Sequence, residues 1–155
     1  GRLLGQLSED DERAVSQALA ALQLDALAEK PVDHLSGGQL QRAFLAMTLA
    51  QGAPVMLLDE PTAALDLPTA GRLLTELKRV AVERNGLIVA AIHDLPLALA
   101  RADSVVVIAE GRVIASLAPA NTELPGALEA AFGPEIREFL PSSQDLPGSV
   151  EKCKV

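Results

Sequence analysis

The sequence has no tryptophan, no tyrosine and only three phenylalanines among its 155 residues. Apolar residues still make up 49% of the chain, so a core must be built from leucine, valine, isoleucine and alanine. The single cysteine, Cys153, lies in a polar C-terminal stretch, which excludes a disulfide framework and a cysteine-rich zinc cluster within this sequence. The length is that expected for one domain or for part of one.

Basic residues and long apolar runs are also scarce. Lysine and arginine total 13 against 21 aspartate and glutamate residues, which gives a formal net charge of −8. Because nucleic acid phosphates are bound by clustered basic side chains, this balance argues against nucleic acid as a partner. No apolar run has the length of a membrane-spanning helix, and Gly1–Arg2 does not open a signal peptide. We therefore expect a reducing, cytoplasmic setting.

Helical signals occupy most of the chain. Residues 8–30 are predicted to form a helix that begins with a capping box of Ser8 and Asp11. Its apolar residues follow helical spacing, and they are Val15, Ala18, Leu19 and Leu22. Four further helices are predicted: residues 36–50, a helix from the cap Asp66 to Asn85–Gly86, a short helix from Pro96 after the cap Asp94, and one ending at Phe132–Gly133.

Short apolar segments between the helices predict strands. Residues 55–58 and 87–92 are continuous apolar runs, as expected for strands that are buried on both faces. Their strand–helix–strand order predicts a parallel sheet with helices packed on its faces. Residues 104–109 and 112–117 are predicted to pair as a hairpin through a tight turn at Glu110–Gly111.

These signals predict the α/β class, divided into three regions. Residues 1–50 are predicted to form a helical subdomain, because they are acidic, rich in alanine and without strand signals. Residues 51–140 are predicted to hold the parallel strands, their flanking helices and the hairpin. Residues 141–155 are rich in serine, proline, glycine and charge, and are predicted to be a flexible tail.

Two adjacent carboxylates follow the first apolar strand. The stretch "VMLLDE" ends at Asp59 and Glu60, and Pro61 comes next. A parallel sheet binds ligands at the carboxyl ends of its strands, where Asp59 could hold a Mg²⁺ ion through water and Glu60 could orient an attacking water. The alternative is a strand that simply runs into an acidic loop, and these six residues alone do not decide between the two.

Two further patterns fit the binding of phosphate. "LSGGQ" places Ser36, Gly37 and Gly38 at the start of a helix, where bare N–H groups and the helix dipole favour an anion. The alternative is an ordinary helix cap with flexible glycines. His93 ends the strand "LIVAAIHD" beside Asp94, where it could contact a phosphate, and the alternative is a structural histidine.

The order "LSGGQ-x-QR", "hhhhDEPT-x-ALD" (h, apolar) and a strand ending in "HD" resembles the ATPase subunit of ABC transporters, over residues 1 to about 140. The resemblance implies a partial P-loop NTPase fold that binds ATP and Mg²⁺. It makes Ser36–Gln39 the signature loop, which binds the γ-phosphate of ATP held by the opposite subunit. By the same resemblance Asp59 holds Mg²⁺, Glu60 is the catalytic base, His93 contacts the γ-phosphate, and Ala64–Asp66 form the D-loop at the dimer interface. The nucleotide-binding residues implied are Ser36, Gly37, Gly38, Gln39 and Asp66.

The resemblance also implies partners and a location. The family works as a dimer of ATPase subunits bound to transmembrane permease subunits, on the cytoplasmic face of the membrane. Three stretches look most like importers of ferric siderophores, haem or cobalamin, namely "LDLPTAGRLL", "IHDLPLALARAD" and "AAFGPEIREF". The alternatives are an interaction module without ATP turnover and a soluble ABC-type ATPase.

The sequence departs from the family at its start. It contains no G-x-x-x-x-G-K-[ST] phosphate loop, and in the family that loop, the adenine-stacking aromatic and the Q-loop glutamine all precede this region. We therefore expect the C-terminal part of a longer subunit, with apolar surface exposed on its core strands and no ATPase activity of its own. Ala63 and Met47 stand where the family usually has serine and arginine.

Overall fold

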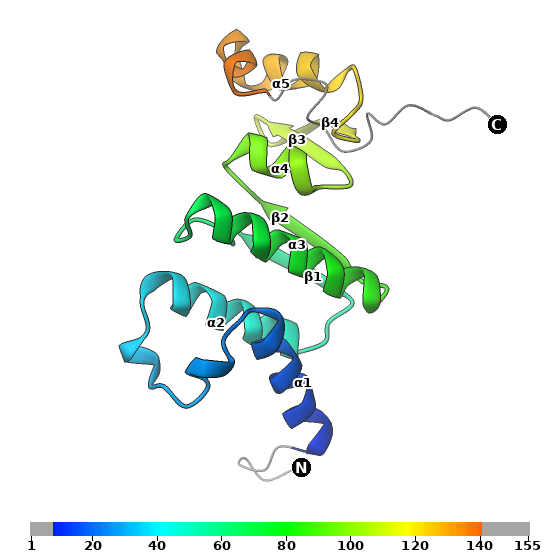
Figure 1. Ribbon diagram of the computed structural model, residues 1–155. Helices are drawn as coiled ribbons and strands as arrows, with labels where there is room; N and C mark the ends of the chain where they lie inside the picture. The colour runs from blue at the N-terminus through cyan, green and yellow to red at the C-terminus, as the bar shows by residue number, and fades with distance from the viewer. Residues whose placement is uncertain (1–7, 141–155) are drawn as a thin grey trace, which may run out of the picture. The chain divides into compact units, whose positions relative to one another are not determined.

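The computed structural model describes residues 8–140 of the chain, and Figure 1 shows the order of the elements. The chain divides into two compact units, Gly1–Ala91 and Ile92–Val155. The boundary predicted after residue 50 lies inside the first unit and stays a prediction. The predicted tail of residues 141–155, with Cys153, lies outside the described residues. No helix among residues 8–140 is long and apolar enough to cross a membrane.

Helix α1 (Glu9–Ala21) begins with the predicted capping box. The Asp11 backbone N–H donates to the Ser8 hydroxyl (3.2 Å), and the Ser8 N–H donates to the Asp11 carboxylate (2.9 Å). The prediction of a helix as far as residue 30 was wrong. The helix ends at Ala21 because Gln23 takes a left-handed backbone (φ 55°), which turns the chain so that Leu22 and Leu24 are both buried. A short 3₁₀ turn, η1 (Asp25–Leu27), follows.

Helix α2 (Gly37–Ala50) packs against α1 and confirms the helix predicted over residues 36–50. A second 3₁₀ turn, η2 (Val32–His34), leads into it. The Arg42 guanidinium donates to the carbonyl of Leu22, the C-cap residue of α1, at 3.1 Å. The last carbonyls of a helix have no partner within it, and a cation there also favours the dipole. Arg42 therefore ties the end of α1 to α2.

Strands β1 (Val55–Asp59) and β2 (Leu87–Ala91) pair in parallel, with Val55 opposite Leu87 and Asp59 opposite Ala91. Helix α3 (Leu67–Glu83) connects them and packs against β2 (Figure 1). The buried residues of α3 are Ala70, Gly71, Leu73, Leu74, Leu77 and Val80. The predicted strand–helix–strand unit, its Asp66 cap and its parallel pairing are confirmed.

One face of the parallel pair is buried on β1 and half-buried on β2, and the other face is exposed, so the prediction of burial on both faces was wrong. Met56 and Leu58 are 5% and 8% exposed, whereas Leu57 between them is 76% exposed. On the same open face Val55, Leu87 and Val89 are 48–55% exposed. The reason is that α3 covers one face of this sheet, while no other described element of the first unit covers the opposite face. The expected exposure of apolar surface on the core strands is confirmed.

The second unit contains α4 (Leu95–Arg101), the antiparallel pair β3 (Val105–Ala109) and β4 (Arg112–Leu117), α5 (Leu124–Phe132) and a 3₁₀ turn, η3 (Pro134–Phe139). Its core consists of Leu99, Val107, Leu124 and Leu128. The hairpin turn has positive φ at both Glu110 (50°) and Gly111 (72°), as two-residue hairpin turns with the favoured twist require. The predicted hairpin, the predicted start of α4 and the predicted C-terminal end of α5 are confirmed within about one residue.

Candidate functional site

The two candidate carboxylates lie where β1 ends. Asp59 is the last strand residue and Glu60 follows it, and both are exposed. Pro61 is then fully buried and has no N–H with which to continue the ladder. A strand of apolar residues thus delivers two neighbouring carboxylates to the carboxyl edge of the sheet, the edge at which parallel sheets bind ligands.

Glu60 has an unusual backbone. Its φ is +44°, in the left-handed region that residues other than glycine seldom adopt, at a typical cost of about 1–3 kcal/mol. The Glu60 N–H donates to the carbonyl of Ala91 on β2 (3.1 Å), and the Glu60 carbonyl accepts from the Ala63 N–H (3.2 Å). The same carbonyl accepts from the Gln41 side-chain amide on α2 (3.3 Å). Such conformations gather at functional sites, where the surroundings hold them in place.

The signature loop forms the N-terminus of α2. The Gln39 N–H donates to the Ser36 hydroxyl (3.4 Å), and the Ser36 N–H donates to the Gln39 side-chain oxygen (3.0 Å). This capping box leaves the N–H groups of Gly37 and Gly38 in the first turn, where a helix supplies no acceptor of its own. No acidic residue lies in this turn, so the positive end of the helix dipole is not neutralised by its own residues.

The two glycines of this turn have different surroundings. A Cβ atom added to Gly38 would lie 3.1 Å from the Ala64 carbonyl oxygen and 3.1 Å from the Leu65 side chain, whereas at Gly37 it would meet nothing within 4 Å. A side chain at position 38 would therefore press on the backbone of Ala64, whereas the space beside Gly37 is open. The start of α2 lies directly against residues 60–66, which we call the D-loop turn.

Asp66, at the end of the D-loop turn, caps α3. Its carboxylate accepts from the Thr69 N–H (2.8 Å), and it is exposed. The hydrogen bonds from the Thr69 backbone and hydroxyl, with the nearby Arg72, hold the pKa of Asp66 below its ordinary value of 3.8. The cap predicted at Asp66 is confirmed, and its contact with nucleotide stays a prediction.

His93 belongs to the second unit, where it stands two residues after the end of β2 with an exposed side chain. Its neighbour Asp94 caps α4 by accepting from the Leu97 N–H (2.8 Å), as predicted. The cap fixes the backbone beside His93. The contact of His93 with phosphate stays a prediction.

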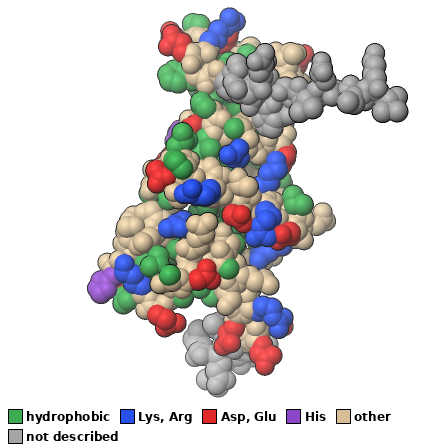
Figure 2. Space-filling model, viewed as in Figure 1, with side chains coloured by type: hydrophobic (Ala, Val, Ile, Leu, Met, Phe, Trp, Pro, Cys, Tyr) green, Lys and Arg blue, Asp and Glu red, His purple; other side chains and the backbone are tan. Residues whose placement is uncertain are grey.

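The carboxylates at the end of β1 are suited only to a metal ion that takes few ligands from the protein. Among residues 8–140 no group of three or more histidine, cysteine, aspartate or glutamate side chains could hold a metal. Magnesium is commonly bound by one or two carboxylates and otherwise by water and substrate phosphates, so Asp59 at an open sheet edge fits it. Figure 2 shows acidic and basic side chains interspersed over the viewed face, without a broad basic patch on that face.

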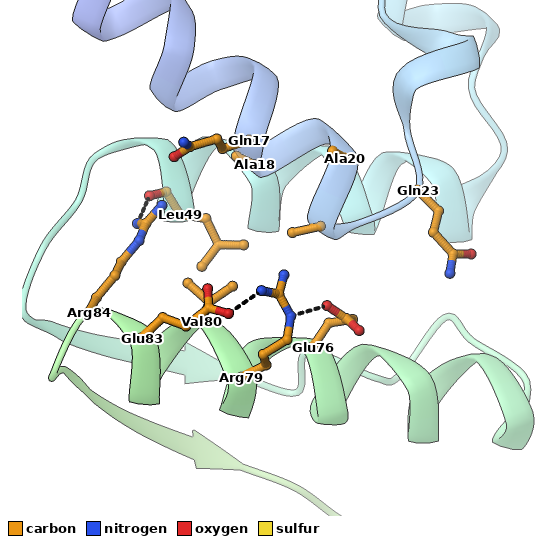
Figure 3. A pocket seen from close by; sticks show the side chains of 11 residues that line it. Gln17, Ala18, Ala20, Gln23, Leu49, Glu76, Arg79, Val80, Glu83 and Arg84 are labelled. Atoms are coloured by element: carbon orange, nitrogen blue, oxygen red, sulfur yellow. Dashed lines mark hydrogen bonds and ion pairs between the residues drawn. The ribbon is translucent and has the colours of Figure 1, made fainter.

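A separate hollow of about 500 Å³ lies between α1, α2 and α3 (Figure 3). Its lining residues are Gln17, Ala18, Ala20, Ala21, Gln23, Leu49, Glu76, Arg79, Val80, Glu83 and Arg84. Its charged groups already have partners. Arg79 bridges Glu76 (2.9 Å) and Glu83 (2.5 Å), and Arg84 donates to the Leu49 carbonyl (2.6 Å). None of the candidate site residues lines this hollow.

Gln41 is the site residue whose role the sequence did not reveal. It was visible only as the second glutamine of "Gln-x-Gln-Arg", and its contact spans 19 positions of sequence to Glu60. The available sequence signal for Gln41 was the recurrence of polar residues directly after the two glycines that open the helix.

Comparison with known proteins gives one consistent result. The family model described as "ABC transporter" matches residues 3–63. The chain is 42% identical over 129 residues to the cobalamin import ATP-binding protein of Halobacterium salinarum, covering 83% of the chain and 32% of that protein. It is also 44% identical over 116 residues to a Bacillus subtilis protein named "probable siderophore transport system ATP-binding protein". This match covers 75% of the chain and 42% of that protein.

The solved structures agree. A dimeric ATP-binding cassette bound to ADP and Pi, in a post-hydrolysis state, superposes with a TM-score of 0.64 at 28% identity and covers 76% of the chain and 51% of that structure. The chain thus spans between about a third and a half of the length of these relatives. The predicted α/β class, with a partial ABC ATPase fold, is confirmed.

Proposed function

The chain belongs to the ABC transporter family, and we propose on that premise that it supplies the hydrolytic half-site of an ATPase subunit that drives import. The proposal rests on one observation above the others. The glycine-capped start of α2, which has no acidic residue in its first turn, lies against the turn of residues 60–66, which begins with Glu60 directly after Asp59. Relatives about 40% identical are ATP-binding proteins of import systems, which supports the same conclusion.

Each residue has a distinct role in the proposed reaction. Asp59 would hold Mg²⁺ through water, and when bound this ion neutralises charge on the transferring phosphate. Glu60 polarises the attacking water and accepts its proton, because its carboxylate lies one residue beyond Asp59 at the same sheet edge. His93 donates a hydrogen bond to the γ-phosphate. The assignments of Asp59 and Glu60 follow the family pattern and their placement at the end of β1, and that of His93 follows the family pattern alone.

The signature loop serves a different nucleotide from Asp59 and Glu60. In the proposed dimer the Ser36 hydroxyl and the N–H groups of Gly37 and Gly38 bind the γ-phosphate of ATP held by the opposite subunit, with the help of the α2 dipole. Gln39 keeps this turn in shape through the capping box. Ala64–Asp66, the last part of the D-loop turn, lie at the interface of the proposed dimer. A dimeric cassette with bound ADP and Pi among the similar structures supports this arrangement.

We further propose permease subunits as membrane partners, on the cytoplasmic face, and a ferric siderophore, haem or cobalamin as cargo. The cargo classes come from the names of the relatives. A second candidate function is an interaction module without turnover, which is favoured for this chain taken alone by the lack of a G-x-x-x-x-G-K-[ST] loop in its 155 residues.

The test is ATP-driven uptake by the natural-length protein that contains this chain, reconstituted with its permease in liposomes. Wild type is expected to hydrolyse ATP and import cargo. Glu60→Gln keeps ATP binding but should lose about 10²–10⁴ in hydrolysis rate, because general-base assistance is of that size. Near-normal hydrolysis by Glu60→Gln would remove Glu60 from its role. A wild-type protein that binds the permease but turns over no ATP would favour the interaction module.

A further inference from the structure

We propose that Gln41 is a positioning residue for Glu60, holding the strained Glu60 peptide from the helix that carries the signature loop. The inference rests on the proposed function of Glu60 as the catalytic base. Gln41 is the second glutamine of the "Gln-x-Gln-Arg" pattern, and the proposed reaction assigns it no role. Gln39 serves the α2 cap and Arg42 binds the Leu22 carbonyl, which leaves the partner of Gln41 to be explained.

The Gln41 side chain contacts the Glu60 peptide, whose backbone conformation is strained. At φ +44° the Glu60 backbone is outside the relaxed region, and such a residue persists only where its surroundings over-determine it. Two hydrogen bonds to the backbone restrain this peptide, through Ala91 and Ala63. The third is the Gln41 amide, which donates to the Glu60 carbonyl at 3.3 Å. Because the backbone at Glu60 sets the direction of its side chain, this contact bears on where the carboxylate points.

The contact also links two parts of the proposed reaction. Gln41 follows Gly37 by four residues, so the two lie on one face of α2. Gly38, in the same first turn, packs against the Ala64 carbonyl. The first turn and a half of α2 therefore touches the D-loop turn at Gly38 and at Gln41. A phosphate that binds the start of α2 is coupled in this way to the peptide of Glu60 in the same chain.

The chemistry of the contact explains why glutamine suits this position. A carbonyl needs a donor, and the glutamine amide supplies N–H groups without adding a charge beside the two carboxylates. Glutamate has the same length but no donor when ionised, and methionine fills a similar volume with no donor at all. Lysine reaches as far and keeps N–H donors. These three substitutions separate hydrogen bonding from packing.

The experiment compares Gln41→Met and Gln41→Glu with wild type in the natural-length protein. Both are expected to lower kcat by about 10- to 100-fold, the range produced when a catalytic group is misplaced by about 1 Å. The KM for ATP and the melting temperature should stay unchanged, and Gln41→Lys should recover part of the loss. Gln51→Ala is the matched control, because Gln51 is an exposed glutamine at the other end of α2. A kcat within twofold of wild type in Gln41→Met, or an equal loss in Gln51→Ala, would overturn the proposal.

A double-mutant cycle then separates this proposal from the one on which it rests. If Gln41 acts through Glu60, Gln41→Met should cause no further loss of single-turnover hydrolysis in a Glu60→Gln background. A full additional loss in that background would overturn the positioning role. If Glu60→Gln alone hydrolyses ATP normally, the proposed function fails. If Glu60→Gln is inactive while Gln41→Met is normal, only the inference about Gln41 fails.

Discussion

Helices α1 and α2 begin with the same hydrogen-bonded cap but carry different charges in their first turns. Each has serine at the N-cap, at Ser8 and Ser36, and each closes a reciprocal capping box with its third helical residue. In α1 that residue is Asp11, within a first turn that also contains Glu9, Asp10 and Glu12. In α2 it is Gln39, and the first turn has no acidic residue.

The difference decides which helix end can bind an anion. An α-helix N-terminus carries the equivalent of about half a positive charge, which nearby carboxylates neutralise. The carboxylates of α1 stabilise that helix and would repel a phosphate. The start of α2 keeps its positive end and has a glycine, Gly37, with open space beside it. Capping alone is thus no sign of function, whereas capping without acidic residues, beside a glycine with open space, fits the anion site that we propose.

Among changes that test this comparison, the largest effect should come from giving the first turn of α2 an acidic residue like those of α1. Gln39→Glu keeps the capping-box geometry, so the fold should persist. The added carboxylate would lie in the same first turn as the N–H groups proposed to bind the γ-phosphate, and juxtaposed like charges cost several kcal/mol, so hydrolysis should fall by at least about tenfold. Steady-state ATPase assays of the natural-length protein measure this. Asp11→Asn, which removes a charge from α1, is the control and should leave hydrolysis unchanged, whereas normal activity in Gln39→Glu would break the comparison.

The two glycines of α2 should separate stability from function. Gly38→Ala forces a Cβ to 3.1 Å from the Ala64 carbonyl, and overpacking of this kind costs about 1–3 kcal/mol in the free energy of unfolding. Gly37→Ala has open space, so stability should hold while hydrolysis falls through blocked access to the N–H groups. Urea denaturation and ATPase assays on both variants test this. Equal destabilisation by the two substitutions would contradict the assigned roles.

Removal of either serine cap should lower stability by a similar amount, but only one removal should change ATP hydrolysis. Ser8→Ala and Ser36→Ala should each lower the free energy of unfolding by about 0.5–2 kcal/mol, because each removes an N-cap acceptor. Only Ser36→Ala should also reduce ATP hydrolysis. Thermal denaturation and ATPase measurements on the matched pair provide the test. An equal loss of hydrolysis in Ser8→Ala would show that the effect comes through stability alone.

The smallest expected effect is a pH dependence at the cap of α3, where a carboxylate does what a hydroxyl does in α2. The pKa of Asp66 in the folded chain lies below 3.8, since the Thr69 N–H binds its charged form. Its stabilisation is therefore fully present above pH 3.8 and is lost as the pH falls through the folded-state pKa. Unfolding curves of wild type and Asp66→Asn should differ near neutral pH and converge in acid. A difference that stays constant with pH would contradict this sign.

Local signals in the sequence predicted the caps and turns well. The caps at Ser8, Asp66 and Asp94 depend on residues at most three positions apart, and each was found as expected. The cap at Ser36, which is equally local, was considered as the alternative to an anion site and is also present. The hairpin turn at Glu110–Gly111 is similarly local. Such contacts can be read from spacing because no distant part of the chain takes part in them.

Long-range contacts account for what the sequence did not predict. Helix α1 ends at Ala21 in a region where the chain turns at Gln23 and Arg42 binds the Leu22 carbonyl, which spacing does not show. The apolar runs of β1 and β2 predicted two covered faces, but apolar composition does not tell which faces find partners. The Gln41–Glu60 contact joins a helix to a strand end, and likewise appears only in three dimensions.

The central claim is that the start of α2, and not that of α1, binds the γ-phosphate across a dimer. The direct measurement is a crystal structure of the natural-length Glu60→Gln protein trapped with Mg²⁺ and ATP. The account predicts the γ-phosphate within hydrogen-bonding distance of the Ser36 hydroxyl and the Gly37 N–H of one subunit, with Asp59 of the other subunit beside the metal. A γ-phosphate bound by a single subunit, with the start of α2 in contact with solvent alone, would contradict it.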